Sequence, residues 1–483
     1  MKSAICSKVF SFLIVSLLIL LGSCQKEKIT IDDNNKIYKD KIDRPAPLPQ
    51  DPLIQVYFNH NISQGVNYTD PYRKITRPGD NLEAIIIREI EAAKNSIELA
   101  VFELNLPLIA RSLVKKSQEG VAVKIILDRR NVKSFSQFSP QEIAKFSARE
   151  KNKYREYLAL VDLNRDGKLN KEEIETRDAL IILQNGKIPI IDNTEDGSKG
   201  SNLMHQKFII VDNKKIVTGS ANFTLSGIHG DFQNSETRGN VNNLLVIESV
   251  ELANIFAEEF NLMWGDGPEL TENSIFGKKK PDRNPQEVKI GEASVTVDFS
   301  PISTKKPWNS SGNGFIAQNL EKAESTVNLA LFVFSSQNLA DRLGVVNDRG
   351  VEIKALFDRS FAFRYYSEGL DLLGVGLRNK KCLYEKNNNP WVDPLTTAGV
   401  AKLSRGDKLH HKFAIIDQKI VITGSQNWSA AANYNNDETV LAIASPTVAA
   451  HFIREFSRLY DSAVLGVPKY LDRAIAAQER KCS

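Results

Sequence analysis

Two segments of the chain carry the same polar side chains in the same order. Each begins with His-x-Lys, continues through four residues to Asp, and later reaches a Gly-Ser-x-Asn turn. In the first half the polar residues are His205, Lys207, Asp212, Ser220 and Asn222. In the second half they are His410, Lys412, Asp417, Ser425 and Asn427. The chain has six histidines, so two at matched positions indicate a shared role.

Imidazoles, ammonium groups, hydroxyls and carboxamides together suit the cleavage of a phosphodiester. Lysine and asparagine can hold anionic oxygens and stabilise developing charge. One histidine can attack phosphorus while the other protonates the leaving oxygen. We predict that His205 and His410 share one site. His410 is favoured over the adjacent His411, because residues two apart in a strand, here His410 and Lys412, share a face.

The elements that would position these residues form an internal repeat. Residues 90–104 align with 320–334 as a helix end followed by an apolar strand, and 120–130 align with 350–360 as a strand ending in Asp-Arg. Alternating helices and strands predict an α/β fold, with a mixed sheet covered by helices on both faces in each half. Two such lobes, related by a pseudo-two-fold axis, would bring the two motifs together as a bilobed α/β/α sandwich. We expect a monomer, because one chain carries both half-sites.

These motifs resemble the signature of the phospholipase D superfamily, in which His-x-Lys-x4-Asp and Gly-Ser-x-Asn occur twice. The resemblance covers nearly all of residues 51–465. It implies a covalent phosphohistidine intermediate, resolved by water or an alcohol, and chemistry that requires no metal. It also implies that the lysines and asparagines of the motifs bind phosphate and that the aspartates are structural supports. The predicted catalytic set is the six motif residues His205, Lys207, Asp212, His410, Lys412 and Asp417.

An acidic residue that orients the imidazole often follows each motif in this family. Glu438 stands at that place in the second half, whereas Asn242 stands there in the first. A carboxylate stabilises an imidazolium and an amide does not, so the two histidines are expected to be unequal. If these residues act across the lobe interface, Glu438 supports His205 as the nucleophile; if they act within a lobe, the roles reverse. Asp231 or Glu236 are alternative partners. The predicted phosphate-binding and orienting residues are Ser220, Asn222, Ser425, Asn427 and Glu438.

A second motif lies in the part of the first half that the second half lacks. Residues 162–173, "DLNRDGKLNKEE", match the ligand order of an EF-hand loop, in which a hard Ca²⁺ ion takes oxygen ligands at fixed positions. Helical sequence flanks the loop, and we place the insertion at about 149–183. Calcium is predicted to have a structural or regulatory role there. The predicted ligands are Asp162, Asn164, Asp166, the Lys168 carbonyl, Asn170 and Glu173.

The N-terminus has the pattern of an export signal. Residues 1–23 join lysines to an apolar stretch, and "LGSC" resembles a bacterial lipoprotein cleavage site that would leave Cys24 acylated. We therefore expect an exported, membrane-anchored lipoprotein, at the outer membrane, cell surface or periplasm. In an exported protein Cys382 and Cys482 could form a disulfide or remain separate thiols. The predicted order is signal peptide 1–23, flexible tether 24–50, first lobe 51–265, linker 266–290 and second lobe 291–483.

Three functions remain open on the sequence alone. The first is a phospholipid hydrolase, which the predicted membrane location favours. The second is an endonuclease acting on DNA or RNA, although a net charge of +4 over 483 residues does not by itself favour nucleic acid. The lysines at 214–215 and 278–280 are expected to be solvated surface. The third is a calcium-binding surface lipoprotein on an inactive scaffold. The loop 379–407, with Tyr384 and Trp391, is expected to shape the substrate pocket.

Overall fold

The computed structural model describes residues 30–31, 37–38, 44–194, 202–268 and 273–482. Residues 1–44 and 45–483 form two units. In the first unit, β1 (Thr30–Ile31) pairs antiparallel with β2 (Ile37–Tyr38). The predicted signal peptide and Cys24 lie outside the described residues. Among the helices that the structure describes, none has the length and apolar character needed to span a bilayer.

The first lobe is built on a seven-stranded mixed sheet. Its three strands at one edge run parallel, and the remaining pairs are antiparallel. In spatial order the strands are β3 (Ile54–Phe58), β12 (Asn243–Glu248), β11 (Lys215–Gly219), β10 (Lys207–Val211), β6 (Ser96–Val101), β7 (Ala122–Leu127) and β8 (Ile190–Asp192).

The second lobe repeats this arrangement in a larger mixed sheet. It also takes in β9 (Leu203–Met204), directly before the first motif, which pairs parallel with β22. The two lobes thus share a strand pairing next to His205. In spatial order the other strands are β13 (Gln286–Ile290), β14 (Ala293–Ser300), β22 (Asn436–Ala444), β20 (Ile420–Gly424), β19 (Lys412–Ile416), β15 (Thr326–Leu331), β17 (Glu352–Phe357), β18 (Ala398–Val400) and β23 (Val464–Leu465).

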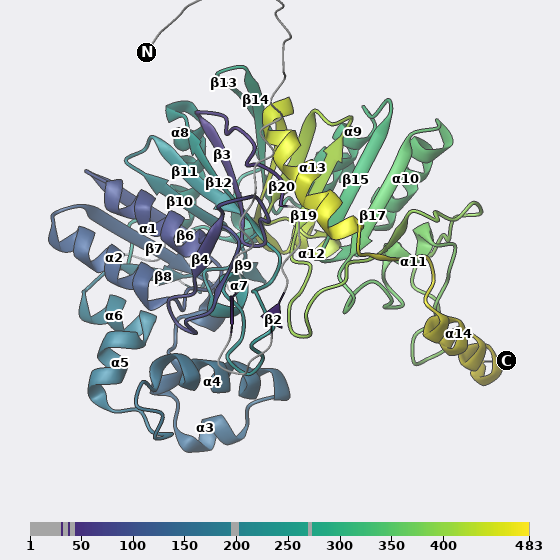
Figure 1. Ribbon diagram of the computed structural model, residues 1–483. Helices are drawn as coiled ribbons and strands as arrows, with labels where there is room; N and C mark the ends of the chain where they lie inside the picture. The colour runs from purple at the N-terminus through teal and green to yellow at the C-terminus, as the bar shows by residue number, and fades with distance from the viewer. Residues whose placement is uncertain (1–29, 32–36, 39–43, 195–201, 269–272, 483) are drawn as a thin grey trace, which may run out of the picture. The chain divides into compact units, whose positions relative to one another are not determined.

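Helices cover both faces of each sheet, as the sequence predicts (Figure 1). The outer faces are packed by α1 (Leu82–Ala92) and α2 (Pro107–Gln118) in the first lobe, and by α9 (Gly312–Leu320) and α10 (Gln337–Asp348) in the second. Between the sheets, α8 (Val250–Trp264) and α13 (Pro446–Tyr460) join one large apolar core with residues of both lobes. Every residue of β10 and β19 is buried, so the residues that follow the first lysine of each strand are all apolar rather than alternately apolar and polar.

Shorter elements fill the connections. Between β7 and β8 the chain forms α3 (Pro140–Ala144), α4 (Ala148–Val161), α5 (Lys171–Arg177) and α6 (Ala179–Asn185), which contain the predicted insertion. Two small sheets pair β4 (Asn67–Thr69) with β5 (Thr76–Pro78) and β16 (Phe334–Ser335) with β21 (Trp428–Ser429). The remaining helices are α7 (Leu225–Ile228), α11 (Glu368–Leu372), α12 (Ala430–Tyr434) and α14 (Lys469–Cys482).

The structure corrects three predictions about boundaries and surfaces. The predicted linker ends early, since residues 286–290 form β13. The last residues of the predicted tether pack on the body, where Arg454 donates to the Ala46 carbonyl and His451 Nε2 lies 3.0 Å from the Pro49 carbonyl. Lys280 is not solvated surface: its ammonium group is buried between Glu259 and Asp437, at 2.5 Å from each. Burial of that cation is tolerated because two carboxylates compensate it.

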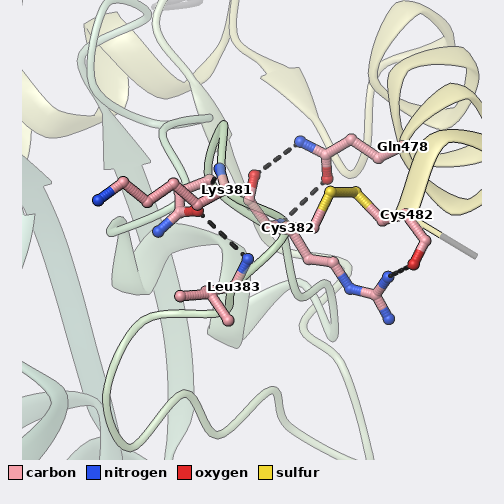
Figure 2. Close-up of a disulfide and its surroundings, with 7 residues drawn as sticks. Lys381, Cys382, Leu383, Gln478 and Cys482 are labelled. Carbon is pink, nitrogen blue, oxygen red and sulfur yellow. Dashed lines mark hydrogen bonds between the residues drawn. A yellow bond between two sulfur atoms is a disulfide. The ribbon is translucent and has the colours of Figure 1, made fainter.

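Cys382 and Cys482 form a disulfide, the first of the two alternatives that the sequence leaves open (Figure 2). The bond joins the loop after α11 to the C-terminal end of α14. Gln478 of α14 accepts a hydrogen bond from the Arg378 amide at 3.0 Å and donates one to the Arg378 carbonyl at 2.7 Å. The C-terminal helix is thereby fixed to the edge of the second lobe.

Candidate active site

Each His-Lys motif and its Gly-Ser-x-Asn turn are brought together by one β-hairpin. β10 pairs antiparallel with β11, and β19 pairs with β20 in the same way. Three residues connect the strands in each lobe, 212–214 and 417–419, and the first two of each have φ between 48° and 57°, the left-handed conformation found in turns that match strand twist. The hairpin predicted from the spacing of His and Ser is confirmed in both lobes.

Asp212 and Asp417 close these hairpins at the end far from the histidines. Asp212 accepts backbone N–H groups of residues 94–96, at the start of β6. Asp417 does the same for residues 324–326, at the start of β15. A five-residue strand is roughly 17 Å long, so neither carboxylate reaches the histidines. Their contacts fit the role that the resemblance implies, in which both aspartates are structural supports within the predicted set.

His205 is held by a carboxylate of the other lobe. Its Nδ1 lies 2.6 Å from Glu438 Oε2, and both side chains are buried. Glu438 also accepts the Ser425 hydroxyl at 2.7 Å and the Asn436 amide at 3.1 Å. With Nδ1–H donated to the carboxylate, the lone pair of His205 resides on Nε2.

His410 has the equivalent arrangement with an amide in place of the carboxylate. Its Nδ1 lies 2.9 Å from Asn242 Oδ1 and 3.1 Å from the Ser220 carbonyl. The Asn242 amide nitrogen donates to the Gly227 and Asn240 carbonyls, which fixes its oxygen toward His410. Both partners of Nδ1 are acceptors, so His410 carries its proton there as well.

The orienting residues thus act across the lobe interface, which decides between the two arrangements that the sequence leaves open. Asp231 and Glu236 do not contact the His410 ring among the described residues. The backbone N–H of Asp231 donates to the Thr237 hydroxyl at 2.7 Å, within the loop that precedes Asn242.

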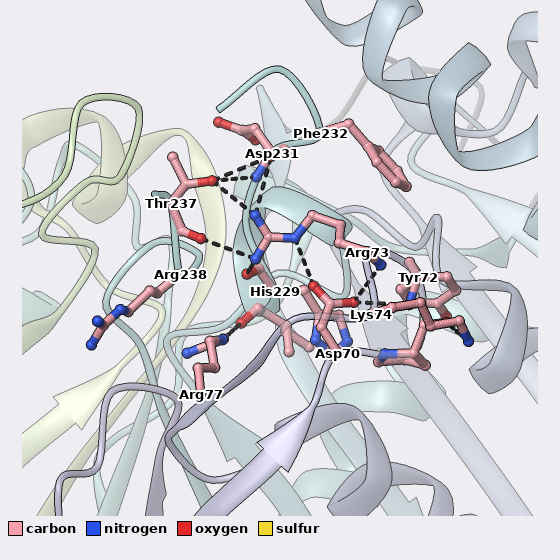
Figure 3. Close-up of polar contacts among 12 residues, drawn as sticks. Asp70, Tyr72, Arg73, Lys74, Arg77, His229, Asp231, Phe232, Thr237 and Arg238 are labelled. Carbon is pink, nitrogen blue, oxygen red and sulfur yellow. Dashed lines mark hydrogen bonds and ion pairs between the residues drawn. The ribbon is translucent and has the colours of Figure 1, made fainter. Parts of the chain in front are cut away.

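Arg73 organises that loop (Figure 3). Its guanidinium donates to the carbonyls of His229, Asp231 and Thr237 at 2.5, 3.1 and 2.9 Å. Asp70 holds the same guanidinium at 2.7 Å. Few alternative conformations satisfy three carbonyls at once, so this network supports the approach of the chain to Asn242 and through it His410.

Lys207 and Lys412 occupy matching places beside the histidines. Each ammonium group donates to the carbonyl of the histidine two residues earlier, at 2.8 and 2.6 Å. Phe102 contacts both His205 and Lys207, and Phe332 contacts both His410 and Lys412. The two half-sites therefore have the same aromatic wall.

Burial of this many cationic groups shifts their proton affinities. Burial lowers the pKa of Lys207 to about 7 and that of Lys412 well below its usual range. Burial, reinforced by both lysines, lowers the pKa of His205 and of His410 well below its ordinary value. Burial raises the pKa of Glu438 to about 7, against the opposing effect of Lys207. An anion entering the site would favour the charged lysines and a protonated histidine.

The carboxamides of Asn222 and Asn427 have no side-chain hydrogen bond within the described parts of the chain. Their Oδ1 atoms are buried and unpartnered. A buried acceptor without a donor costs free energy, which a hydroxyl of the ligand or a water molecule would reduce, while the amide nitrogen can donate to an anionic oxygen. Two free carboxamides and two lysines form a set that suits an anionic oxygen ligand.

Two further aspartates position the motifs, and the sequence analysis did not single them out. Asp128 Oδ2 accepts the Met204 amide at 3.0 Å, and Asp358 Oδ2 accepts the Leu409 amide at 2.9 Å. Each therefore holds the residue directly before a site histidine. The signal was present in the aligned Asp-Arg ends of the two repeated strands.

The predicted calcium loop lies between α4 and α5. Asp162, Asn164 and Asp166 each turn one side-chain oxygen onto a backbone N–H within the loop, at 2.8–2.9 Å. The second oxygen of Asp162 is buried without a partner. Both Glu173 oxygens accept backbone N–H groups, from Leu163, Asn164 and Asn170. The donor set fits Ca²⁺, provided that Glu173 exchanges those hydrogen bonds for the ion.

α4 connects this loop with the surroundings of both histidines. Lys153 of α4 contacts Glu103 at 2.8 Å, next to the Phe102 that packs on His205. Glu156 of α4 accepts the backbone N–H of Phe232 at 2.7 Å, in the loop that leads to Asn242.

Comparison with known proteins identifies the chain. The family described as cardiolipin synthase, PLD-like domain, matches residues 86–264 and 316–460. The chain belongs to this family, within the phospholipase D superfamily. Its matched repeats include both hairpins and both site histidines.

Relatives of the chain include proteins whose names refer to lipid substrates. It is 30% identical over 157 residues to the mitochondrial cardiolipin hydrolase of Mus musculus, covering 32% of this chain and 61% of the relative. It is 31% identical over 151 residues to a phospholipase D of Rickettsia typhi, covering 31% and 64%. The chain thus spans less than two thirds of each. The phosphatidylserine synthase of Haemophilus influenzae has the same fold, with a TM-score of 0.51 at 11% identity over 91% of this chain.

Proposed function

We propose that this chain is a phosphodiesterase, which hydrolyses the head-group phosphodiester of phospholipids through a phosphohistidine intermediate. The observation that carries the mechanism is the unequal pair across the lobe interface, His205 on Glu438 and His410 on Asn242. Glu438 stabilises the positive charge that develops on His205 as Nε2 attacks phosphorus. Asn242, the partner of His410, is neutral and does not stabilise the imidazolium. His410 therefore loses a proton more easily and is the acid.

The reaction proceeds in two steps. In the first, the bond from His205 Nε2 to phosphorus forms and the bond from phosphorus to the head-group oxygen breaks, while His410 Nε2 gives that oxygen a proton. In the second, His410 takes a proton from water, whose oxygen displaces His205 and releases phosphatidic acid. Lys207, Lys412, Asn222 and Asn427 hold the phosphate oxygens throughout, and Ser220 and Ser425 fix the two orienting residues.

The lipid substrate is favoured over nucleic acid by two considerations. The family and the relatives reported above carry names that refer to cardiolipin or phospholipids. A lipoprotein anchor at Cys24 would hold the chain at a membrane surface, where such substrates are abundant. The small net charge provides little of the phosphate-neutralising surface on which nucleic-acid affinity depends.

We further propose that Ca²⁺ binds the 162–173 loop and regulates the site through α4. Ordering of Glu173 on the ion would fix the helices on either side of the loop. The contacts of Lys153 with Glu103 and of Glu156 with Phe232 would then carry that ordering toward both histidines. The chemistry itself uses only side chains of the two motifs.

The substrate is tested with vesicles of phosphatidylethanolamine and cardiolipin. The protein is incubated with them and phosphatidic acid is measured by mass spectrometry, with His410→Ala as the blank. Phosphatidic acid formed only by the unmodified protein supports the proposal. Cleavage of labelled oligonucleotides without any phosphatidic acid would transfer the same mechanism to a nuclease.

A further inference from the structure

A second group of acidic side chains gathers in the second lobe, outside the active site. Glu368 and Asp371 lie on α11, Asp341 lies on α10, and Glu385 lies on the loop that follows α11. Glu368 and Asp371 are each only 1% exposed. Among the described residues, none of the four carboxylates forms an ion pair with a lysine, arginine or histidine. This differs from the buried carboxylate Glu259, which has Lys280 as its partner.

Three buried oxygen atoms in this group lack a hydrogen-bond donor among the described residues. They are Glu368 Oε2, Asp371 Oδ1 and Gln337 Oε1. The orientation of the Gln337 amide is fixed, because its nitrogen donates to Asp371 Oδ2 at 2.7 Å and to Asp341 Oδ1 at 3.2 Å. The three atoms are all acceptors, so what they lack is a proton or a cation.

A single proton does not satisfy the group. The carboxyl groups of Glu368 and Asp371 lie within hydrogen-bonding reach of each other, so one proton could bridge them. It would leave Gln337 Oε1 without a partner. Burial, with the neighbouring carboxylates, raises the pKa of Glu368 to about 9 and that of Glu385 to about 7. Burial is the larger cause of both shifts and the neighbouring carboxylates add to it, whereas a bound cation would favour the ionised carboxylates.

We propose that Glu368, Asp371 and Gln337 bind a divalent cation, Ca²⁺ in preference to Mg²⁺, with Glu385 and Asp341 as outer acidic groups. Carboxylate and carboxamide oxygens are the ligands of hard cations, and Ca²⁺ tolerates the irregular arrangement that Mg²⁺ does not. No three His, Cys, Asp or Glu side chains of the described chain are close enough to hold a metal by themselves. The site therefore depends on the amide oxygen of Gln337 and on water ligands.

A cation at this site would restrain the loop 379–407, which the sequence predicts to shape the substrate pocket. Asp371 already forms two hydrogen bonds with this loop. Its side chain accepts one from the Asn389 backbone amide at 3.2 Å, and its backbone carbonyl accepts one from the Trp391 amide at 2.8 Å. Glu385 belongs to the same loop, and the Cys382–Cys482 disulfide holds its beginning (Figure 2). A cation beside Asp371 would remove the repulsion between Glu385 and α11 and make the loop less mobile.

Hydrogen exchange followed by mass spectrometry tests this site directly. The full-length protein carries Glu173→Gln, which removes the last predicted calcium ligand of the 162–173 loop. Its hydrogen exchange in EGTA is compared with its exchange in calcium. Amides of residues 383–397 are expected to exchange about tenfold more slowly at a calcium concentration ten times the dissociation constant. Glu368→Gln together with Asp371→Asn should abolish the difference. Asp348→Asn should leave it intact, because Asp348 is an exposed carboxylate of α10, the helix that carries Gln337.

Two results would overturn the proposal. The first is exchange in 383–397 that does not respond to calcium in the Glu173→Gln protein, which decides the matter even if the other variants do not fold. The second is a calcium response that persists when both Glu368 and Asp371 have been replaced. Neither hydrogen-exchange readout depends on enzymatic activity, so the test of the cation site is independent of the test of the proposed substrate.

Discussion

Glu438 of the second lobe holds His205 of the first, with Oε2 2.6 Å from Nδ1, whereas His410 has the neutral Asn242 at 2.9 Å. The two half-sites are otherwise closely matched, down to the phenylalanine beside each histidine. The proposed roles of the two imidazoles therefore rest on one carboxylate.

Glu438→Gln should lower kcat by about 10²-fold with the fold intact, since the amide orients the ring but does not stabilise its positive charge. The measurement is kcat on lipid vesicles, with circular dichroism to verify folding. An unchanged kcat would show that Glu438 has no part in activating His205.

Asn242→Asp is the matched change in the other half-site. A carboxylate beside His410 should raise the pKa of its imidazolium, so the acid stays protonated to higher pH and the alkaline limb of the kcat profile moves upward. A full pH profile distinguishes this from a general loss of activity. A downward shift of the alkaline limb would contradict the assignment of His410 as the acid.

His410→Ala should reduce kcat by at least about 10³-fold, because the leaving group loses its proton donor. His411→Gln is the neighbouring control: His411 is buried between Asn243 and Glu455, so its loss should lower the melting temperature while the folded protein stays active. Comparable losses of kcat in both folded variants would contradict the choice of His410 over His411.

Calcium should slow hydrogen exchange in residues 162–174, and Glu173→Gln should remove this effect. Glu172→Gln serves as control, because Glu172 is exposed in the same first turn of α5. Equal calcium responses in the two variants would show that the loop does not bind the ion through its last ligand.

In EGTA, Glu368 should make the protein less stable as the pH rises. Its pKa is about 9 in the folded state against 4.5 in the unfolded state, so the folded protein binds the extra proton and stability is lost between these values. The slope contributed by one such group is at most about 1.4 kcal/mol per pH unit. Glu368→Gln should flatten the dependence of the unfolding free energy on pH between 7 and 9. A slope unchanged by the substitution would show that Glu368 does not hold that proton.

The sequence predicted the fold and the pairing of the motifs because both depend on local sequence patterns. Strand and hairpin spacing repeat in the two halves, and matched lobes place matched residues together. It also located the difference between Glu438 and Asn242. It could not decide which histidine each one serves, because that depends on how β22 meets β9 across the lobes.

Other features were hidden because they arise from contacts between distant segments. Lys280 lies in a lysine cluster that looks solvated, yet Glu259 and Asp437 from opposite lobes enclose it. Gln337 and Asp371 are 34 residues apart and meet only in the folded second lobe. Asp212 and Asp417 belong to the same sequence motifs as the histidines, although a strand separates them in space.

The central claim, that His205 is the nucleophile, is tested most directly by trapping the intermediate. The substrate is a phosphodiester with a p-nitrophenyl leaving group, which departs without needing a proton from an acid. The His410→Ala protein should therefore form the adduct. It should then accumulate the adduct, because it lacks the base that activates water for hydrolysis. Neutral quenching and peptide mapping by mass spectrometry locate the added phosphoryl group. We predict an adduct on His205 in the His410→Ala protein and none in the His205→Ala protein. An adduct on His410 in the His205→Ala protein, with none on His205 in its counterpart, would contradict the assignment.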